Sequence, residues 1–118
     1  MRSLENGSQE RGIMNIKKLA ENLGLEEDEY LEILELFIDT GMADIEKLSS
    51  AIEEGNTEEA SQAAHSLKGA SGNLGLMEIY DVALKSEETA RNNSLDGLAE
   101  SVQTLKEELN SLAEVTRK

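Results

Sequence analysis

Apolar side chains recur three or four residues apart along almost the whole chain from residue 16 onward, which is the spacing of one face of an α-helix. Proline, the commonest helix breaker, does not occur in any of the 118 residues. The pattern is most regular near the C-terminal end, where it consists of Leu95, Leu98, Val102, Leu105, Leu109 and Leu112. The spacing predicts an all-α protein, because half-buried strands would need apolar residues with a period of two.

Glycines and N-capping side chains divide this pattern into five helices. With their caps, the expected helices span residues 15–24, 26–54, 57–75, 76–92 and 94–112. Asn15, Thr57 and Ser94 are the expected N-caps. The first helix is too short to be stable alone, so we expect it to lie as a lid across an antiparallel, up-and-down four-helix bundle.

The first 14 residues lack this helical period and are rich in small and polar types. We expect residues 1–14 to be a flexible leader, either a linker from a longer protein or a remnant of an expression vector. Residues 15–118 are long enough for one helical domain with a single modest core.

The charge and composition exclude several classes of partner. The formal net charge of −14 and the pI near 4.3 argue against binding to nucleic acid or to anionic membrane surfaces, which attract basic patches. Cysteine is absent, and no apolar run approaches the roughly 20 residues that span a bilayer. No signal-peptide pattern follows the N-terminus. We therefore expect a soluble, monomeric protein of the cytoplasm.

The single histidine lies on the outer face of the third expected helix. At about 100° per residue, the inner stripe of this helix is Ala60, Ala63, Ala64, Leu67, Ala70, Ser71 and Leu74. His65 falls on the opposite side, together with Ser61, Lys68, Gly69 and Gly72. Each glycine costs a helix about 0.8–1.0 kcal/mol relative to alanine. With no packing benefit expected on an exposed face, this cost suggests that another molecule comes close to the histidine.

The same face is unusually free of negative charge. Residues 60–77 contain no Asp or Glu, although 25 of the 118 residues are acidic. Carboxylates would repel an anionic phosphoryl group, whereas the ammonium group of Lys68 would attract one. An exposed histidine is most often only a surface residue, and Gly75 is explained equally well as a helix end. The combination of histidine, lysine and two glycines on one acid-free face is what favours phosphoryl chemistry.

The run Ala64-His65-Ser66-Leu67-Lys68-Gly69, followed by Gly72 and by Leu74-Gly75, resembles the signature of the histidine phosphotransfer (HPt) domain of two-component phosphorelays. The resemblance extends over about residues 16–113. It implies that His65 accepts a phosphoryl group and exchanges it with an aspartate of a response-regulator receiver domain. It also implies a carrier without autokinase activity and with no cofactor of its own, since the Mg²⁺ belongs to the receiver. The partners would be a receiver domain, a hybrid sensor kinase, or both.

The resemblance also suggests roles for the neighbours of His65. Lys68 would neutralise phosphoryl oxygens, while Ser61, Gly69 and Gly72 would form the surface on which the partner docks. Glu87 occupies the position of a family residue that hydrogen-bonds the second ring nitrogen. Arg91 stands where some members place a basic residue near the phosphoryl group, although a plain surface ion pair with Glu87 is the alternative. Ser86 departs from the leucine that is commoner in the family and leaves the packing around Glu87 open.

A second hypothesis is a helical interaction module without phosphate chemistry, which would recruit a partner helix through the C-terminal leucine seam. An enzyme with its own nucleophile constellation is a poor fit, and so is a metal site, because the chain has one histidine and no cysteine. The motif does not identify the kinase or regulator served, nor the direction of phosphate flow. It also leaves open whether the chain acts alone or as a module of a larger kinase.

Overall fold

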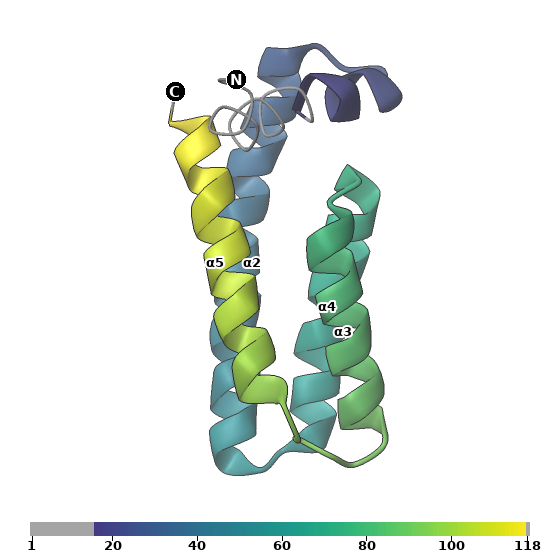
Figure 1. The fold of residues 1–118 in the computed structure, drawn as a ribbon, viewed down its shortest axis with the longest axis vertical. Coiled ribbons are helices and arrows are strands. Elements are labelled where there is room, and N and C mark those ends of the chain that lie inside the picture. The colour runs from purple at the N-terminus through teal and green to yellow at the C-terminus, as the bar shows by residue number, and fades with distance from the viewer. Residues whose placement is uncertain (1–15, 118) are drawn as a thin grey trace, which may run out of the picture.

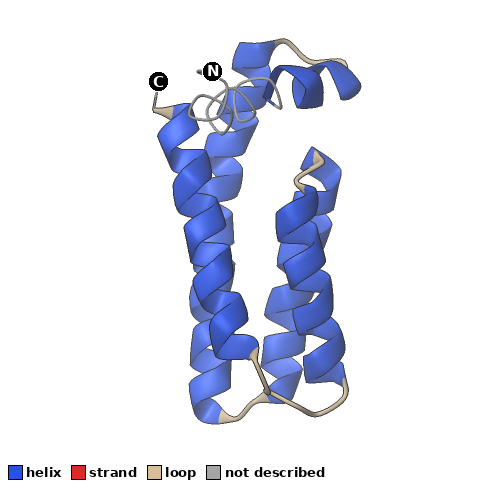
Figure 2. Ribbon diagram, viewed as in Figure 1, coloured by secondary structure: helices blue, strands red, loops and turns tan. Residues whose placement is uncertain are grey.

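The computed structural model describes residues 16–117, which form four long helices preceded by a short one over residues 16–22. The long helices are α2 (Glu27–Glu54), α3 (Thr57–Leu74), α4 (Met77–Arg91) and α5 (Leu98–Thr116). In Figure 1 each long helix runs antiparallel to the one before it, and α2 packs beside both α3 and α5. The described residues contain no strand (Figure 2). The expected all-α, up-and-down four-helix bundle is confirmed, whereas the expected leader over residues 1–14 lies outside the described residues.

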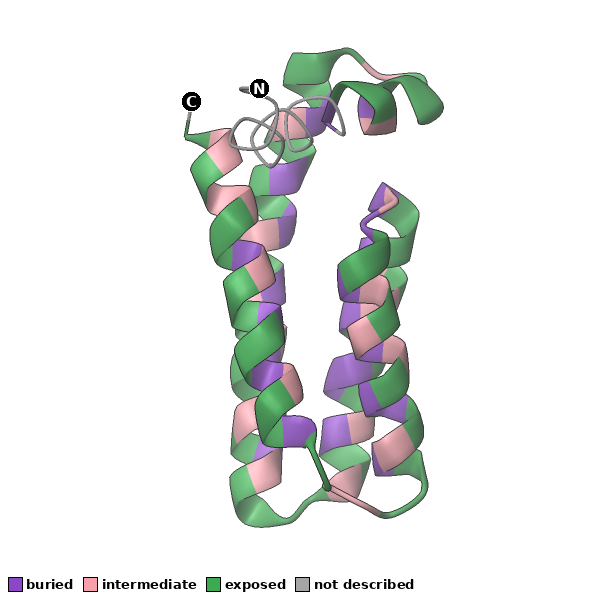
Figure 3. Cartoon of the chain, in the orientation of Figure 1, coloured by how far each residue is buried: buried purple, intermediate pink, exposed green. Residues whose placement is uncertain are grey.

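The core lies along the centre of the bundle, where apolar side chains from all four long helices meet. In Figure 3 the buried positions of these helices face the centre of the bundle. Its largest fully buried members include Leu34, Ile45, Leu48, Leu67, Ile79, Leu105 and Leu109. Burying one such side chain contributes roughly 1.5–3 kcal/mol, so these residues hold the helices at fixed positions around the axis. No helix of the described part is both long and apolar enough to cross a membrane.

The short helix over residues 16–22 covers one end of the bundle, as expected for a lid. Ile16 and Ala20 are buried in the common core. The same helix packs against the turn between α3 and α4, because a Cβ added at Gly75 would lie 2.8 Å from Leu19 Cδ2. Gly75 also has a φ of +76°, a backbone conformation that favours glycine. Asn15, the expected N-cap of this helix, lies outside the described residues.

Two of the expected helix starts were wrong. Asn56, not Thr57, is the N-cap of α3, and its side chain accepts a hydrogen bond from the Glu59 backbone N–H at 3.0 Å. Asparagine is the better cap of the two, since its carbonyl oxygen reaches the free N–H groups of the first turn more favourably. Ser94 does not cap α5, because its hydroxyl accepts from the Asp96 backbone N–H at 3.1 Å within a turn. The last helix therefore starts at Leu98 rather than at residue 95.

Candidate functional site

His65 projects from the outer face of α3, about midway along the bundle. Its side chain is 68% exposed, whereas Ala64 and Leu67 on the inner face of the same helix are fully buried. The inward stripe that the sequence predicts for this helix is thus buried, apart from the half-buried Ala70. The core on one side of α3 fixes the ring on the other side, at the surface where another molecule reaches it.

A carboxylate from α4 orients the imidazole. His65 Nδ1 lies 2.9 Å from Glu87 Oε2, although 22 residues separate the two in the sequence. A carboxylate only accepts hydrogen bonds, so Nδ1 carries the proton and donates it to Glu87. On the neutral ring Nε2 is then the unprotonated nitrogen, and it has no hydrogen-bond partner among the described residues. The contact between Glu87 and the second ring nitrogen that the family resemblance implies is therefore present.

Three cationic or hydrogen-bonding groups surround the carboxylate of Glu87, whose side chain is only 5% exposed. Lys68 Nζ lies 2.7 Å from Oε1, and Arg91 Nη1 lies 3.6 Å from Oε2. Burial acts to raise the pKa of Glu87, but hydrogen bonds and positive charge from Lys68 and His65 outweigh it and hold the pKa below its usual value. Glu87 is therefore charged when it holds the ring.

Lys68 is placed one turn from His65, as expected, but its ammonium group is bound to Glu87. Its side chain is 23% exposed, and its Nζ reaches one oxygen of the carboxylate while His65 reaches the other. An ammonium group has three N–H donors, so donors remain beyond the one given to Glu87. Arg91 is 69% exposed and forms an i,i+4 ion pair with Glu87. The sequence had left two interpretations of Arg91 open, a phosphoryl-binding residue or a surface ion pair, and this ion pair is present.

The two glycines near His65 differ in their surroundings. A Cβ added at Gly69 would meet no atom within 4 Å, so nothing inside the protein requires glycine there. A Cβ at Gly72 would lie 3.1 Å from Tyr80 Cδ1 of α4. The expectation that neither glycine has a packing benefit was thus wrong for Gly72, which lets the Tyr80 ring lie against α3. Ser61, one turn before His65, is half-buried on the same helix.

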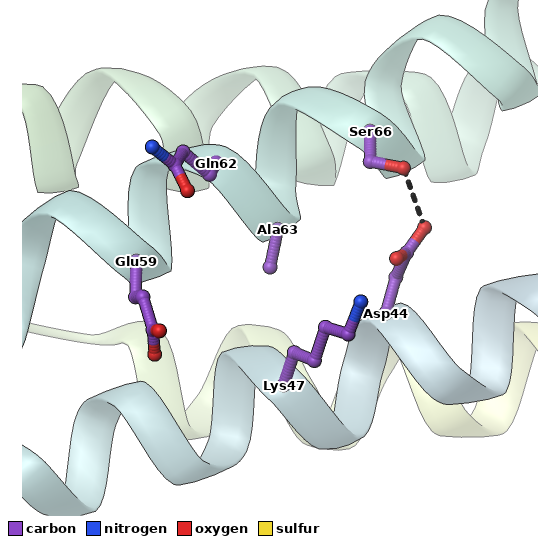
Figure 4. A pocket seen from close by; sticks show the side chains of 6 residues that line it. All are labelled: Asp44, Lys47, Glu59, Gln62, Ala63 and Ser66. Atoms are coloured by element: carbon purple, nitrogen blue, oxygen red, sulfur yellow. Dashed lines mark hydrogen bonds between the residues drawn. The ribbon is translucent and has the colours of Figure 1, made fainter.

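Sequence reasoning missed the contact between Ser66 and Asp44. The hydroxyl of Ser66 donates to Asp44 Oδ2 at 2.8 Å and joins α3 to α2 beside the histidine (Figure 4). No motif pointed to Asp44, because it lies on another helix, 22 residues away. Ser86, the departure from the family pattern, is buried, and its hydroxyl donates to the Val82 carbonyl at 2.8 Å. Its polar group is thus satisfied within α4, next to Glu87.

No group of three or more His, Asp or Glu side chains in residues 16–117 is arranged to hold a metal ion. The site consists instead of an exposed imidazole with one defined tautomer, a buried carboxylate behind it and two cations beside it. Such a site suits the transfer of an anionic group to Nε2.

Comparison with known proteins agrees with this geometry. The family model described as the Hpt domain matches residues 32–115. The crystal structure of histidine-containing phosphotransfer protein B from Pseudomonas aeruginosa PAO1 superimposes with a TM-score of 0.74 and 25% sequence identity, over 84% of this chain and 86% of that one. No curated protein matches the chain. The match to more than half of its length shows that this chain belongs to the Hpt domain family.

Proposed function

We propose that His65 carries a phosphoryl group on Nε2 and exchanges it with the aspartate of a response-regulator receiver domain. Membership of the family gives the coarser role, histidine phosphotransfer in a phosphorelay. The observation that supports exchange at Nε2 with a receiver aspartate is the 2.9 Å contact of His65 Nδ1 with Glu87, on a ring that is 68% exposed. It leaves Nε2 both unprotonated and accessible.

The transfer needs no general base on this chain. The lone pair of Nε2 attacks the phosphorus of the aspartyl phosphate in line, the P–N bond forms, and the P–O bond to the aspartate breaks. The bonding electrons leave with the aspartate carboxylate. The ring then carries a proton on Nδ1 and phosphorus on Nε2, with one positive charge that faces the carboxylate of Glu87. The same steps in reverse return the group to an aspartate.

Lys68 and Arg91 would stabilise the transferred group by sharing their donors between Glu87 and the phosphoryl oxygens. Lys68 is the nearer candidate, since it is bound to the carboxylate that also holds the ring. Glu87 acts as a positioning residue, because it touches only the imidazole and the two cations. Magnesium would be held by the carboxylates of the receiver, and the chain would act as a carrier without autokinase activity or a cofactor of its own. We place this exchange in the cytoplasm, with the chain as a monomer.

Labelling by a phosphorylated receiver tests the proposed function. We expect a panel of receiver domains to include at least one that labels the chain at a single acid-labile, alkali-stable site. We expect His65→Gln to take no label, because glutamine offers no ring nitrogen. Phosphoramidate, a small donor that phosphorylates imidazoles directly, should label the parent and not the variant. Equal labelling of His65→Gln and the parent by the receiver would overturn the assignment.

The alternative function, recruitment of a partner helix by the C-terminal leucine seam, loses its basis in the structure. Leu98, Val102, Leu105 and Leu109 are at most 7% exposed because they form part of the bundle core. A partner helix would have to displace α2 or α4 to reach them. Binding of a partner that is unaffected by His65→Ala would favour this alternative.

A further inference from the structure

The two oxygens of the Glu87 carboxylate hold different groups. Oε2 accepts the hydrogen bond from His65 Nδ1 at 2.9 Å, and the guanidinium group of Arg91 lies 3.6 Å from the same oxygen. Oε1 is bound by Lys68 Nζ at 2.7 Å. Because the side chain of Glu87 is buried, these protein groups and not bulk water surround most of the carboxylate. The ring of His65 is thus held by one oxygen of a buried anion.

This anion supplies something that a neutral hydrogen-bond acceptor would not. A glutamine at position 87 would also accept a hydrogen bond from Nδ1, through its amide oxygen, and would select the same tautomer. Only a glutamate adds a negative charge next to the ring, and that charge persists at neutral and alkaline pH because the pKa of Glu87 is lowered by Lys68 and His65 in spite of burial. At a buried position such a charge is weakly screened by solvent. Orientation of the ring and its electrostatic environment are therefore separable properties of this residue.

The charge matters most when the phosphoryl group leaves His65. Nε2 is then bonded to phosphorus, and a proton on Nδ1 makes the ring a cation. When water or an aspartate attacks the phosphorus, the P–N bond breaks and its electrons return to Nε2. If Nδ1 carries its proton, the leaving group is a neutral imidazole, whereas without the proton it would be an imidazolate anion, which leaves far more slowly. The proton on Nδ1 therefore controls whether the phosphoryl group is transferable.

The other charged groups around the ring do not substitute for Glu87. Lys68 from α3 and Arg91 from α4 are cations, and a nearby positive charge disfavours a protonated ring. On the α2 side, Asp44 accepts its hydrogen bond from Ser66 and not from the imidazole. Within residues 16–117, Glu87 is the one acidic side chain that is hydrogen-bonded to the ring. Without its charge, the protein groups that face the ring would be predominantly positive.

We infer that the negative charge of Glu87, and not only its hydrogen bond, keeps Nδ1 protonated in the phosphorylated chain and so keeps the phosphoryl group transferable through neutral and mildly alkaline pH. The inference rests on the proposed function, since it concerns the phosphorylated form of His65. Glu87 remains a positioning residue, because it acts through the ring and does not touch the phosphorus. With a glutamine in its place, the chain would still accept the phosphoryl group but would release it more slowly as the pH rises.

The rate at which the phosphorylated chain loses its phosphoryl group to water tests this inference. The parent, Glu87→Gln and Glu88→Gln are loaded with phosphoramidate, freed of the donor and followed from about pH 6 to about pH 9. Glu88→Gln is the matched control, since Glu88 is the next residue of α4, is exposed and forms no ion pair with a described residue. We expect the pH at which hydrolysis has slowed to half to fall by about one unit or more in Glu87→Gln, so that at about pH 9 it hydrolyses about tenfold more slowly than the parent. Glu88→Gln should stay within about twofold of the parent throughout.

Nitrogen-15 NMR of the ring gives a second measurement, which needs no variant. In the phosphorylated parent, Nδ1 should remain protonated at a pH at which Nδ1 of free phosphohistidine has lost its proton. Loss of the proton at the same pH in both would overturn the inference. Hydrolysis with the same pH profile in Glu87→Gln and the parent, after urea unfolding has shown that the variant is folded, would overturn it as well.

Transfer from the loaded chains to an unphosphorylated receiver distinguishes this inference from the proposed function. The ratio of the parental rate to that of Glu87→Gln should rise with pH and reach about tenfold near pH 9, as in hydrolysis. If no receiver accepts the group from the parent while the hydrolysis profiles differ as expected, the proposed exchange with a receiver fails and the role of Glu87 stands. If a receiver accepts it from both chains with the same pH profile, the proposed function stands and the role of its charge is overturned.

Discussion

The ammonium group of Lys68 lies 2.7 Å from Oε1 of Glu87, the shortest ion pair in the part of the chain that the structure describes. The carboxylate is 5% exposed, and an unpaired charge at such a position is costly. Lys68 therefore stabilises the fold as well as the transferred group that we propose. The motif alone suggested only the second role. The two roles are linked, since the same carboxylate also holds the imidazole of His65.

Lys68→Met should lower both stability and the rate of phosphotransfer. The substitution keeps much of the side-chain volume but leaves Glu87 with only His65 and Arg91 as partners, so we expect a loss of about 1–3 kcal/mol in the free energy of unfolding. Urea unfolding and transfer from a phosphorylated receiver measure the two effects. Lys85→Met is the matched control, because Lys85 is exposed on the same bundle and forms no ion pair with a described residue. A variant as stable as the control would contradict the structural role of Lys68.

Acid should remove the stabilisation that Glu87 provides. The pKa of Glu87 is lowered in the folded protein, because Lys68 and His65 outweigh the effect of burial. The unfolded chain then binds the proton more tightly, so the stabilisation is complete above the unfolded pKa of about 4.3 and is lost as the pH falls through the folded pKa. We expect Glu87→Gln to be less stable than the parent at about pH 7, with a difference that shrinks below about pH 4. Urea unfolding across this range measures it, and a difference independent of pH would contradict the ion pairs.

Tyr30 should make the fold sensitive to alkali. Its hydroxyl is fully buried and donates to the Leu74 carbonyl at 2.7 Å, and burial raises its pKa to about 12. The unfolded chain ionises first, near pH 10, so we expect stability to fall by about 2–3 kcal/mol between about pH 10 and 12. Tyr30→Phe should lose about 1 kcal/mol at neutral pH, since it leaves that carbonyl unpaired, and should lack this alkaline loss. Unfolding in urea at several pH values distinguishes the two proteins, and parallel pH curves would count against the buried hydroxyl.

The sequence predicts the register of α3 well, because a period of 3.6 residues is a local property. It places His65, Lys68 and Gly69 on one face without knowledge of any other helix. It does not predict which residue of another helix they meet, and Glu87 was identified only through the resemblance to the family. Neither period nor resemblance identified Asp44, whose contact with Ser66 depends on how α2 and α3 pack. The start of α5 was misplaced for a related reason, since a serine hydroxyl that suits an N-cap also suits a turn.

Gly69 and Gly72 lie three residues apart on the exposed side of α3, yet only one of them has an internal reason to be glycine. A Cβ at Gly72 would approach the Tyr80 ring at 3.1 Å, whereas a Cβ at Gly69 would meet no atom within 4 Å. Gly69 lies in the interior of α3, where alanine is favoured over glycine by about 0.8–1.0 kcal/mol, and Gly72 lies in its last turn. The same substitution at the two sites therefore separates the requirements of folding from those of partner binding.

Gly69→Ala should stabilise the protein and impair its function. We expect the free energy of unfolding to rise by about 0.8–1.0 kcal/mol, because the helix gains propensity and no clash offsets it. Transfer from a receiver should slow about tenfold or more, since the new methyl group stands between the partner and Nε2, where a small displacement of the reacting atoms is costly. Gly72→Ala should gain less stability, because the Tyr80 ring must shift. Phosphoramidate labelling of His65 should be unchanged in Gly69→Ala, and a receiver that transfers to this variant at the parental rate would show that no partner approaches α3 at Gly69.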